Sequence, residues 1–169
     1  AIDKVVEAAV LLRERSDIVF LLIGSGAMRN QVAELIKLHE LKNVRLLDSQ
    51  PKSEIPALWS VQDVAVVPLR DQDVFRTVLP SKMFEAIGMG IPIMLSLPEG
   101  EATELLQETG AGICVEPENP KSMAEGIRRL ADNPALCASI RASSIAAAPR
   151  FSRRTQARKM LESFAAAVK

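Results

Sequence analysis

The sequence predicts an α/β fold in which a parallel sheet is flanked by helices on both faces. Short apolar runs of strand type alternate with segments of helical periodicity along nearly the whole chain, and several of the runs are continuously apolar. Strands that alternate with helices are typical of parallel sheets, and continuous apolar runs are typical of strands buried on both faces. The length of 169 residues corresponds to one domain.

The first half of the chain contains three predicted strands. A helix is expected over residues 1–15, where apolar side chains recur on one face, and the apolar run 18–23 is the first strand. The Gly-Ser-Gly turn at 24–26 breaks this strand, and Trp59 is expected in the core. The other predicted elements of this half are a helix over 27–40, a strand over 44–47, a helix over 53–61 and a strand over 64–67.

The second half begins with a polar loop over residues 69–79. Two further strands and five helices follow it. Each predicted helix start at 120 and 134 carries a proline, a residue favoured at the first helical position. The predicted elements are a helix over 80–90, strands over 91–95 and 112–115, and helices over 102–109, 120–131, 134–147 and 152–168.

The segment LPSKMFEAIGMGIPI, residues 79–93, contains the candidate binding site. Pro80 marks a helix start, and Ser81 and Glu85 share the polar side of that helix. Unpaired N–H groups and the helix dipole favour an anion at this end, and Lys82 adds a full positive charge there. A nucleoside diphosphate suits the site, with Glu85 accepting hydrogen bonds from ribose hydroxyls. An ordinary amphipathic helix of an α/β domain explains the pattern equally well.

The predicted topology locates the functional edge of the sheet. Parallel sheets bind ligands at the carboxyl ends of their strands, where the order of the strands reverses. That edge comprises loops 24–26, 48–52, 68–81 and 96–101. In the commonest doubly wound order the first strand is central, yet this chain opens on a helix. We therefore expect the central first strand to lie upstream of Ala1 in a longer protein.

Composition excludes several classes of function. Basic and acidic residues number 21 each, and the aromatic residues are five Phe and one Trp, so a nucleic-acid partner is not expected. Two Cys without a CxxC pair, and a single His, argue against a zinc site and fit a reducing cytoplasm. Cys114 is expected to be a small buried residue. Asp71 and Asp73 have the spacing of a metal-binding pair, but in a polar loop we expect them only to be solvated, and no metal is expected.

Segments along the whole chain resemble the donor-binding half of a GT-B glycosyltransferase of the retaining group usually called family 4. Besides the segment at 79–93 they are, in the family's order, GSGAMRNQVAEL, NVRLLD, IPALWSVQDVAVVPL, GAGICVEPENPKSMAEGIRRLADNP and FSRRTQARKMLESF. The form PSKMFEA, followed by EGEATELL, is most similar to bacterial enzymes that build O-antigen and capsule polysaccharides. The resemblance implies that residues 1–169 form a Rossmann-like, nucleotide-sugar-binding domain that uses no cofactor, with UDP-sugars favoured as donors.

The resemblance also assigns roles to individual residues. It implies that Glu85 holds the ribose, that Pro80 and Ser81 cradle a phosphate, and that Lys82 strengthens that phosphate site. The family's first glutamate falls on Thr77, which carries no charge, so recognition of the donor sugar is in question. Departure of the diphosphate leaves negative charge that prearranged cations and N–H dipoles stabilise. The catalytic candidates are Glu85 and Lys82, and the donor-binding candidates are Ser49 and Gln50 at the base, Pro80 and Ser81 at the phosphates, and Thr77, Gly100 and Glu101 at the sugar.

In the family, the acceptor binds an N-terminal domain across a cleft, so this chain alone is expected to bind nucleotide weakly and transfer nothing. The expected acceptor is a lipid-linked saccharide. The last predicted helix is basic on one side, and such a face is usually solvated, but it also suits contact of a cytoplasmic protein with the inner membrane face. Its basic residues are Arg153, Arg154, Arg158 and Lys159, with Arg150 just before it, opposite Met160, Leu161, Phe164 and Val168.

Three other functions fit parts of the pattern. A sugar-nucleotide epimerase of the same architecture shares the diphosphate site but needs acid–base carboxylates in its cleft. A non-enzymatic regulatory module, such as a receiver-like domain, needs clustered acids at the end of the first strand, which only upstream sequence decides. A dehydrogenase is disfavoured because the turn at 24–26 is not followed by the third glycine of the dinucleotide fingerprint.

Overall fold

The computed structural model describes residues 1–167 and confirms the predicted α/β fold. Every predicted helix and strand is present in the predicted order, and several helices are shorter than expected at their ends. The strands are β1 (Phe20–Ile23), β2 (Val44–Leu47), β3 (Ala65–Pro68), β4 (Ile93–Ser96) and β5 (Gly112–Val115). The helices are α1 (Ile2–Leu11), α2 (Arg29–Leu38), α3 (Ile55–Ser60), α4 (Ser81–Met89), α5 (Glu101–Thr109), α6 (Pro120–Ala131), α7 (Pro134–Ala147) and α8 (Arg153–Ala167), with short 3-10 helices η1 (Asp73–Thr77) and η2 (Ala148–Phe151).

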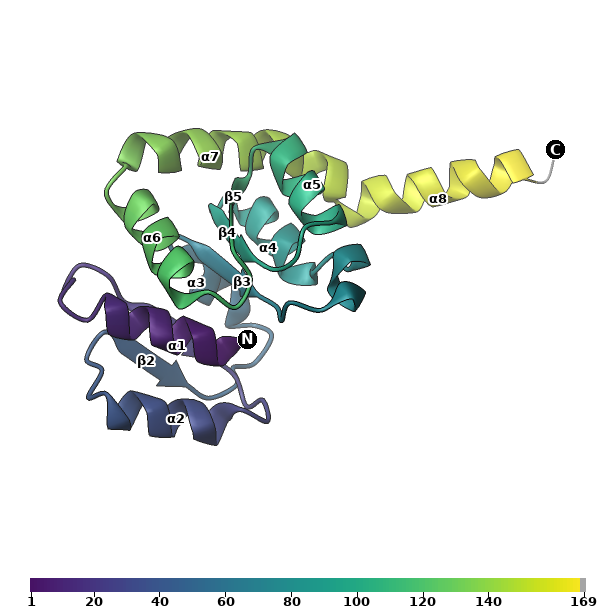
Figure 1. Cartoon of the computed structure of the whole chain (residues 1–169). Coiled ribbons are helices and arrows are strands. Elements are labelled where there is room, and N and C mark those ends of the chain that lie inside the picture. The colour runs from purple at the N-terminus through teal and green to yellow at the C-terminus, as the bar shows by residue number, and fades with distance from the viewer. Residues whose placement is uncertain (168–169) are drawn as a thin grey trace.

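The strands form two separate parallel sheets, one of β1 and β2 and one in the order β3-β4-β5. In the first sheet Phe20 pairs with Val44, and in the second Ile93 pairs with both Ala65 and Gly112. Figure 1 shows α1, α2 and β2 at one end of the molecule, and α4 to α7 grouped around the three-stranded sheet. The β5 edge leaves Cys114 exposed, so the prediction that Cys114 is buried is wrong.

A gap separates the two sheets. Within the described chain β1 pairs only with β2, and β3 pairs only with β4, so one edge of each strand is unpaired. A cavity of about 1170 Å³ lies between these edges, with Val66 of β3 and Leu22 of β1 among its lining residues. Side chains of α1, α6 and α7 also line it. A strand upstream of Ala1, expected from the sequence to be the central one, stays a prediction.

Two core clusters pack on the opposite faces of the sheets. Along β4, Met94 belongs to the cluster with α1, α2 and α6, whereas Ile93 and Leu95 belong to the cluster with α4 and α5. The alternation follows from the two-residue period of a strand. All four residues of β4 are fully buried, as the continuous apolar run predicts for the middle strand of a parallel sheet.

Helix α4 is fixed by one apolar face. Its residues Met83, Ala86 and Ile87 have no exposed surface and pack in the cluster with α5. Gly90 ends the helix in the left-handed conformation, with φ of 66°, which glycine adopts without steric cost. Pro80 precedes the helix as its N-cap with extended backbone, so the helix opens at Pro80–Ser81 as predicted.

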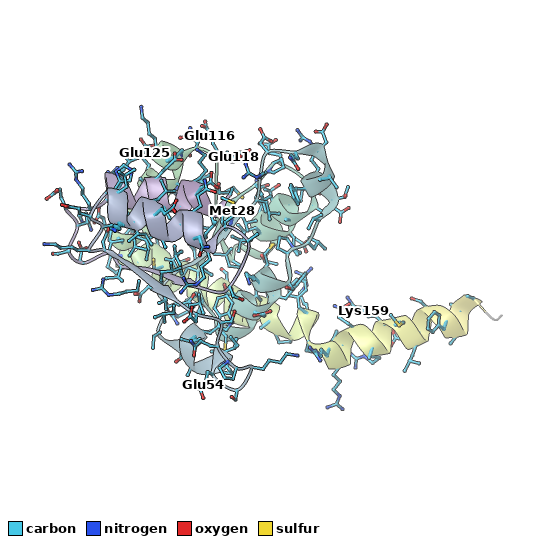
Figure 2. The ribbon with its side chains drawn as sticks, turned by 90° about the horizontal axis from the view of Figure 1, so that it is seen from below. Met28, Glu54, Glu116, Glu118, Glu125 and Lys159 are labelled. Carbon is cyan, nitrogen blue, oxygen red and sulfur yellow. The ribbon has the colours of Figure 1, made fainter. Side chains whose placement is uncertain are left out.

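Helix α8 projects from the body of the molecule (Figure 1), and Figure 2 shows Lys159 on this projecting segment, apart from the other labelled side chains. None of its described residues is buried. The large apolar side chains Met160, Leu161 and Phe164 are all exposed. The last member of the predicted apolar stripe, Val168, lies outside the described residues. No helix within residues 1–167 has the length and apolar character that a membrane crossing requires.

We predict that Met83→Ala lowers the free energy of unfolding by about 3 kcal/mol, because truncating a fully buried side chain leaves a cavity. The matched control is Met160→Ala, the same change at a helical position that is 59% exposed, which shifts stability by less than about 0.5 kcal/mol. Urea denaturation followed by circular dichroism measures both. Equal effects of the two substitutions contradict the burial of the apolar face of α4.

Candidate functional site

The carboxyl ends of β3, β4 and β5 lie at one edge because these strands are parallel, and the loops that leave this edge contact one another. The guanidinium of Arg70, after β3, donates to the carboxylate of Glu118, after β5, at 3.2 Å. The backbone N–H of Asp71 donates to the same carboxylate at 2.9 Å. These bonds connect the long β3–α4 loop to the end of β5, so the loop is held over the sheet edge.

The N-terminal turn of α4 presents unpaired donors at this edge. Within the described chain no side chain caps the helix, and the side chains of Ser81 and Lys82 are exposed. Two neighbouring cations are occupied: Arg70 pairs with Glu118, and Arg76 pairs with Asp73 at 3.0 Å. Lys82 makes no ion pair within residues 1–167, so its ammonium is available to an anion at a helix end that favours negative charge.

The carboxylate of Glu85 lies one turn further along α4 and is held by a tryptophan. The indole Nε1 of Trp59, on α3, donates a hydrogen bond to Oε2 of Glu85 at 3.1 Å. The Trp59 ring is partly buried against the core cluster that contains α4. The prediction that Trp59 lies in the core is right in part, because its ring packs against the core cluster but stays partly exposed. Sequence reasoning missed its contact with Glu85, which joins positions 26 residues apart.

The segment that contains Thr77 packs against the start of α5. A Cβ atom placed on Gly100 would lie 2.0 Å from the backbone oxygen of Arg76, so only glycine permits this approach. The Arg76 guanidinium also donates to the backbone oxygen of Glu99 at 3.2 Å. The structure thus packs η1, which ends at Thr77, against Gly100 at the start of α5. Glu101, the first residue of α5, is exposed beside them.

The predicted base-binding residues lie on the other sheet. Ser49 and Gln50 follow β2 and are exposed. Strand β2 pairs with β1, whereas α4 contacts β3 and β4 of the other sheet. The hydroxyl oxygens of Ser49 and Ser25 are 2.8 Å apart, and the Gln50 amide donates to the backbone oxygen of Asp48 at 3.0 Å. These bonds order the loops after β1 and β2.

Neither the acidic pair of the β3–α4 loop nor the cavity between the sheets forms a second candidate site. Asp73 is engaged by Arg76, and no group of three side chains that suits a metal ion occurs among residues 1–167. The cavity between the sheets is lined by Gly24 and Arg29 near the sheet edge but by none of the α4 residues. Its lining is mainly strand edges and apolar helix side chains, so it is not the site that the sequence predicts.

The model of the family described as "Glycosyl transferases group 1" matches residues 1–146. The chain is 27% identical over 130 residues to WcaI of Escherichia coli (strain K12), whose name assigns it to glycosyl transfer in colanic acid biosynthesis; the match covers 76% of this chain and 31% of WcaI. The chain spans about a third of the length of the curated relatives it matches.

Two solved structures share the fold. One is the C-terminal domain of the group 1 family protein LpcC from Francisella tularensis, with a TM-score of 0.66, 18% identity, and coverage of 83% of this chain and 73% of that chain. The other is Anabaena Alr3699/HepE in complex with UDP, with a TM-score of 0.74, 19% identity, and coverage of 95% of this chain and 44% of that chain.

We predict that Gly100→Ala displaces η1 from α5 and destabilises this contact by about 2 kcal/mol, as overpacking against backbone does. Hydrogen exchange of the amides in Asp73–Thr77 should speed up accordingly. The control is Gly26→Ala, whose added Cβ meets nothing within 4 Å and which leaves that exchange unchanged. Unaltered exchange in the Gly100 variant contradicts the packing of η1 on α5.

Proposed function

The chain belongs to the group 1 glycosyltransferases, and we propose that it is the part of such an enzyme that binds the nucleotide-sugar donor. The observation that carries the proposal is the α4 N-terminus, where Ser81, Lys82 and Glu85 are exposed together beside the carboxyl ends of the strands. The fold shared with the C-terminal domain of LpcC supports it.

In this proposal the donor diphosphate binds at the first turn of α4. Backbone N–H groups after Pro80, the hydroxyl of Ser81 and the ammonium of Lys82 contact its oxygens. These groups are fixed before reaction, so they stabilise the charge that develops on the departing diphosphate without reorganising. The availability of Lys82, in contrast to Arg70 and Arg76, supports this role.

The nucleoside extends from the diphosphate along α4 towards the first sheet. Glu85 accepts hydrogen bonds from the ribose hydroxyls, and Ser49 and Gln50 contact the base. UDP is the nucleotide we propose, because the similar HepE protein was solved in complex with UDP. The sugar lies at the other end of the site, near Thr77, Gly100 and Glu101. Thr77 is uncharged, so it offers the sugar only its own hydroxyl group.

The intact enzyme is proposed to contain more than this domain. A strand upstream of Ala1 would fill the cavity between β1 and β3 and pair with both unpaired edges, joining the sheets into one. Buried edges that carry unpaired N–H and C=O groups are unfavourable, which supports this completion. A further N-terminal domain would bind the acceptor, which we propose is a lipid-linked saccharide of a bacterial polysaccharide, reached at the inner membrane face. Relatedness to WcaI supports this class of product.

We predict that Lys82→Met weakens UDP binding about tenfold while uridine binding changes less than about twofold, because Lys82 contacts only the phosphates. The matched control is Lys37→Met, at an exposed position of α2 away from the site, which changes neither affinity. Calorimetry of the intact protein measures both ligands.

An equal loss of affinity for UDP and for uridine in the Lys82→Met variant contradicts the assignment of Lys82 to the diphosphate.

Incubation of the intact protein with the donor alone provides the second control. Conversion of the donor sugar without any acceptor identifies an epimerase and overturns the proposal of glycosyl transfer.

A further inference from the structure

We propose that Trp59 is a positioning residue whose indole N–H orients the carboxylate of Glu85 towards the ribose hydroxyls of the donor. The inference rests on the proposed function, which assigns the ribose to Glu85. Its basis is the hydrogen bond from Trp59 Nε1 to Glu85 Oε2 at 3.1 Å, which joins α3 to α4.

The direction of this bond is determined by chemistry. Indole nitrogen donates and cannot accept, and an ionised carboxylate only accepts. The bond therefore engages Oε2 and leaves Oε1, with its lone pairs, free to accept from a ribose hydroxyl. A hydrogen bond to an ionised acceptor is also stronger than a neutral one, so it selects one orientation of an exposed side chain.

The indole is itself immobilised by packing. Trp59 is partly buried against the cluster that contains the buried face of α4, so the donor nitrogen has a defined position relative to that helix. Trp59 is the one side chain that hydrogen-bonds the Glu85 carboxylate within residues 1–167, and no ion pair to Glu85 occurs there. Without the hydrogen bond from Trp59, the Glu85 side chain would lose rotamer freedom when it binds the ribose, and this entropy cost would weaken the affinity for the donor.

The test compares two aromatic variants of the intact protein that differ by one hydroxyl. Trp59→Phe keeps an apolar ring but removes the donor, whereas Trp59→Tyr supplies an O–H donor. We expect Trp59→Phe to raise the Kd for UDP about fivefold and to raise the KM for the donor with a smaller change in kcat, and Trp59→Tyr to restore part of the affinity. Equal affinities of the Phe and Tyr variants, or no loss in the Phe variant, overturn the inference.

A double-mutant cycle separates this inference from the proposed function. If Trp59 acts through Glu85, Trp59→Phe changes UDP affinity less than about twofold once Glu85→Ala, which removes every acceptor of that side chain, is present. A full loss in the Ala background overturns the positioning role while the proposed function stands. If Glu85→Ala by itself leaves UDP affinity unchanged, the assignment of Glu85 to the ribose fails.

A measurement with Trp59 in place covers the case in which its variants fail to fold. Trp59 is the single tryptophan of residues 1–169, so its fluorescence reports on the site once any tryptophan elsewhere in the intact protein is replaced by phenylalanine. We expect UDP to alter Trp59 emission and a UDP analogue that lacks the ribose hydroxyls to alter it less at equal occupancy. Identical responses to the two ligands overturn the inference.

Discussion

The division of α4 into a buried apolar face and an exposed polar face is the constraint on which the candidate site depends. Met83 and Ile87 fix the helix against β4 and α5, so the direction of its N-terminus is set by core packing rather than by the site. Lys82 and Glu85 then occupy the side that core packing leaves to solvent. The backbone N–H groups at this helix end are therefore fixed by core packing, as the proposed stabilisation of a developing charge requires.

The second constraint is the incomplete pairing of the sheets. Parallel strands require partners on both edges unless they lie at the border of a sheet, and here β1 and β3 face each other across a cavity of about 1170 Å³. The base-binding candidates Ser49 and Gln50 follow β2 of one sheet, whereas α4 contacts the other sheet. The distance between the two halves of the proposed donor site therefore depends on what fills the gap, and a paired strand there would fix it.

Most of the fold could be predicted from the sequence, because continuous apolar runs and proline at helix starts determine local structure. The bounds of β2, β5, α6 and α7 agree with the prediction residue for residue. Tertiary relations could not be predicted in this way. The hydrogen bond from Trp59 to Glu85 and the packing of η1 against Gly100 join residues far apart in the sequence. Neither contact leaves a pattern in the neighbouring residues from which it could be predicted. The sequence predicts Cys114 to be buried, yet β5 lies at the edge of its sheet, and the residues of a strand do not determine whether that strand is central or at an edge.

Within the site, the roles given to Thr77, Gly100, Ser81, Lys82 and Glu85 all stay predictions. The most direct measurement is a crystal structure of the intact protein with UDP. The account predicts the diphosphate within hydrogen-bond distance of the backbone N–H groups of Ser81 and Lys82, and the ribose hydroxyls on the Glu85 carboxylate. UDP bound elsewhere, with Glu85 free of the nucleotide, would contradict it.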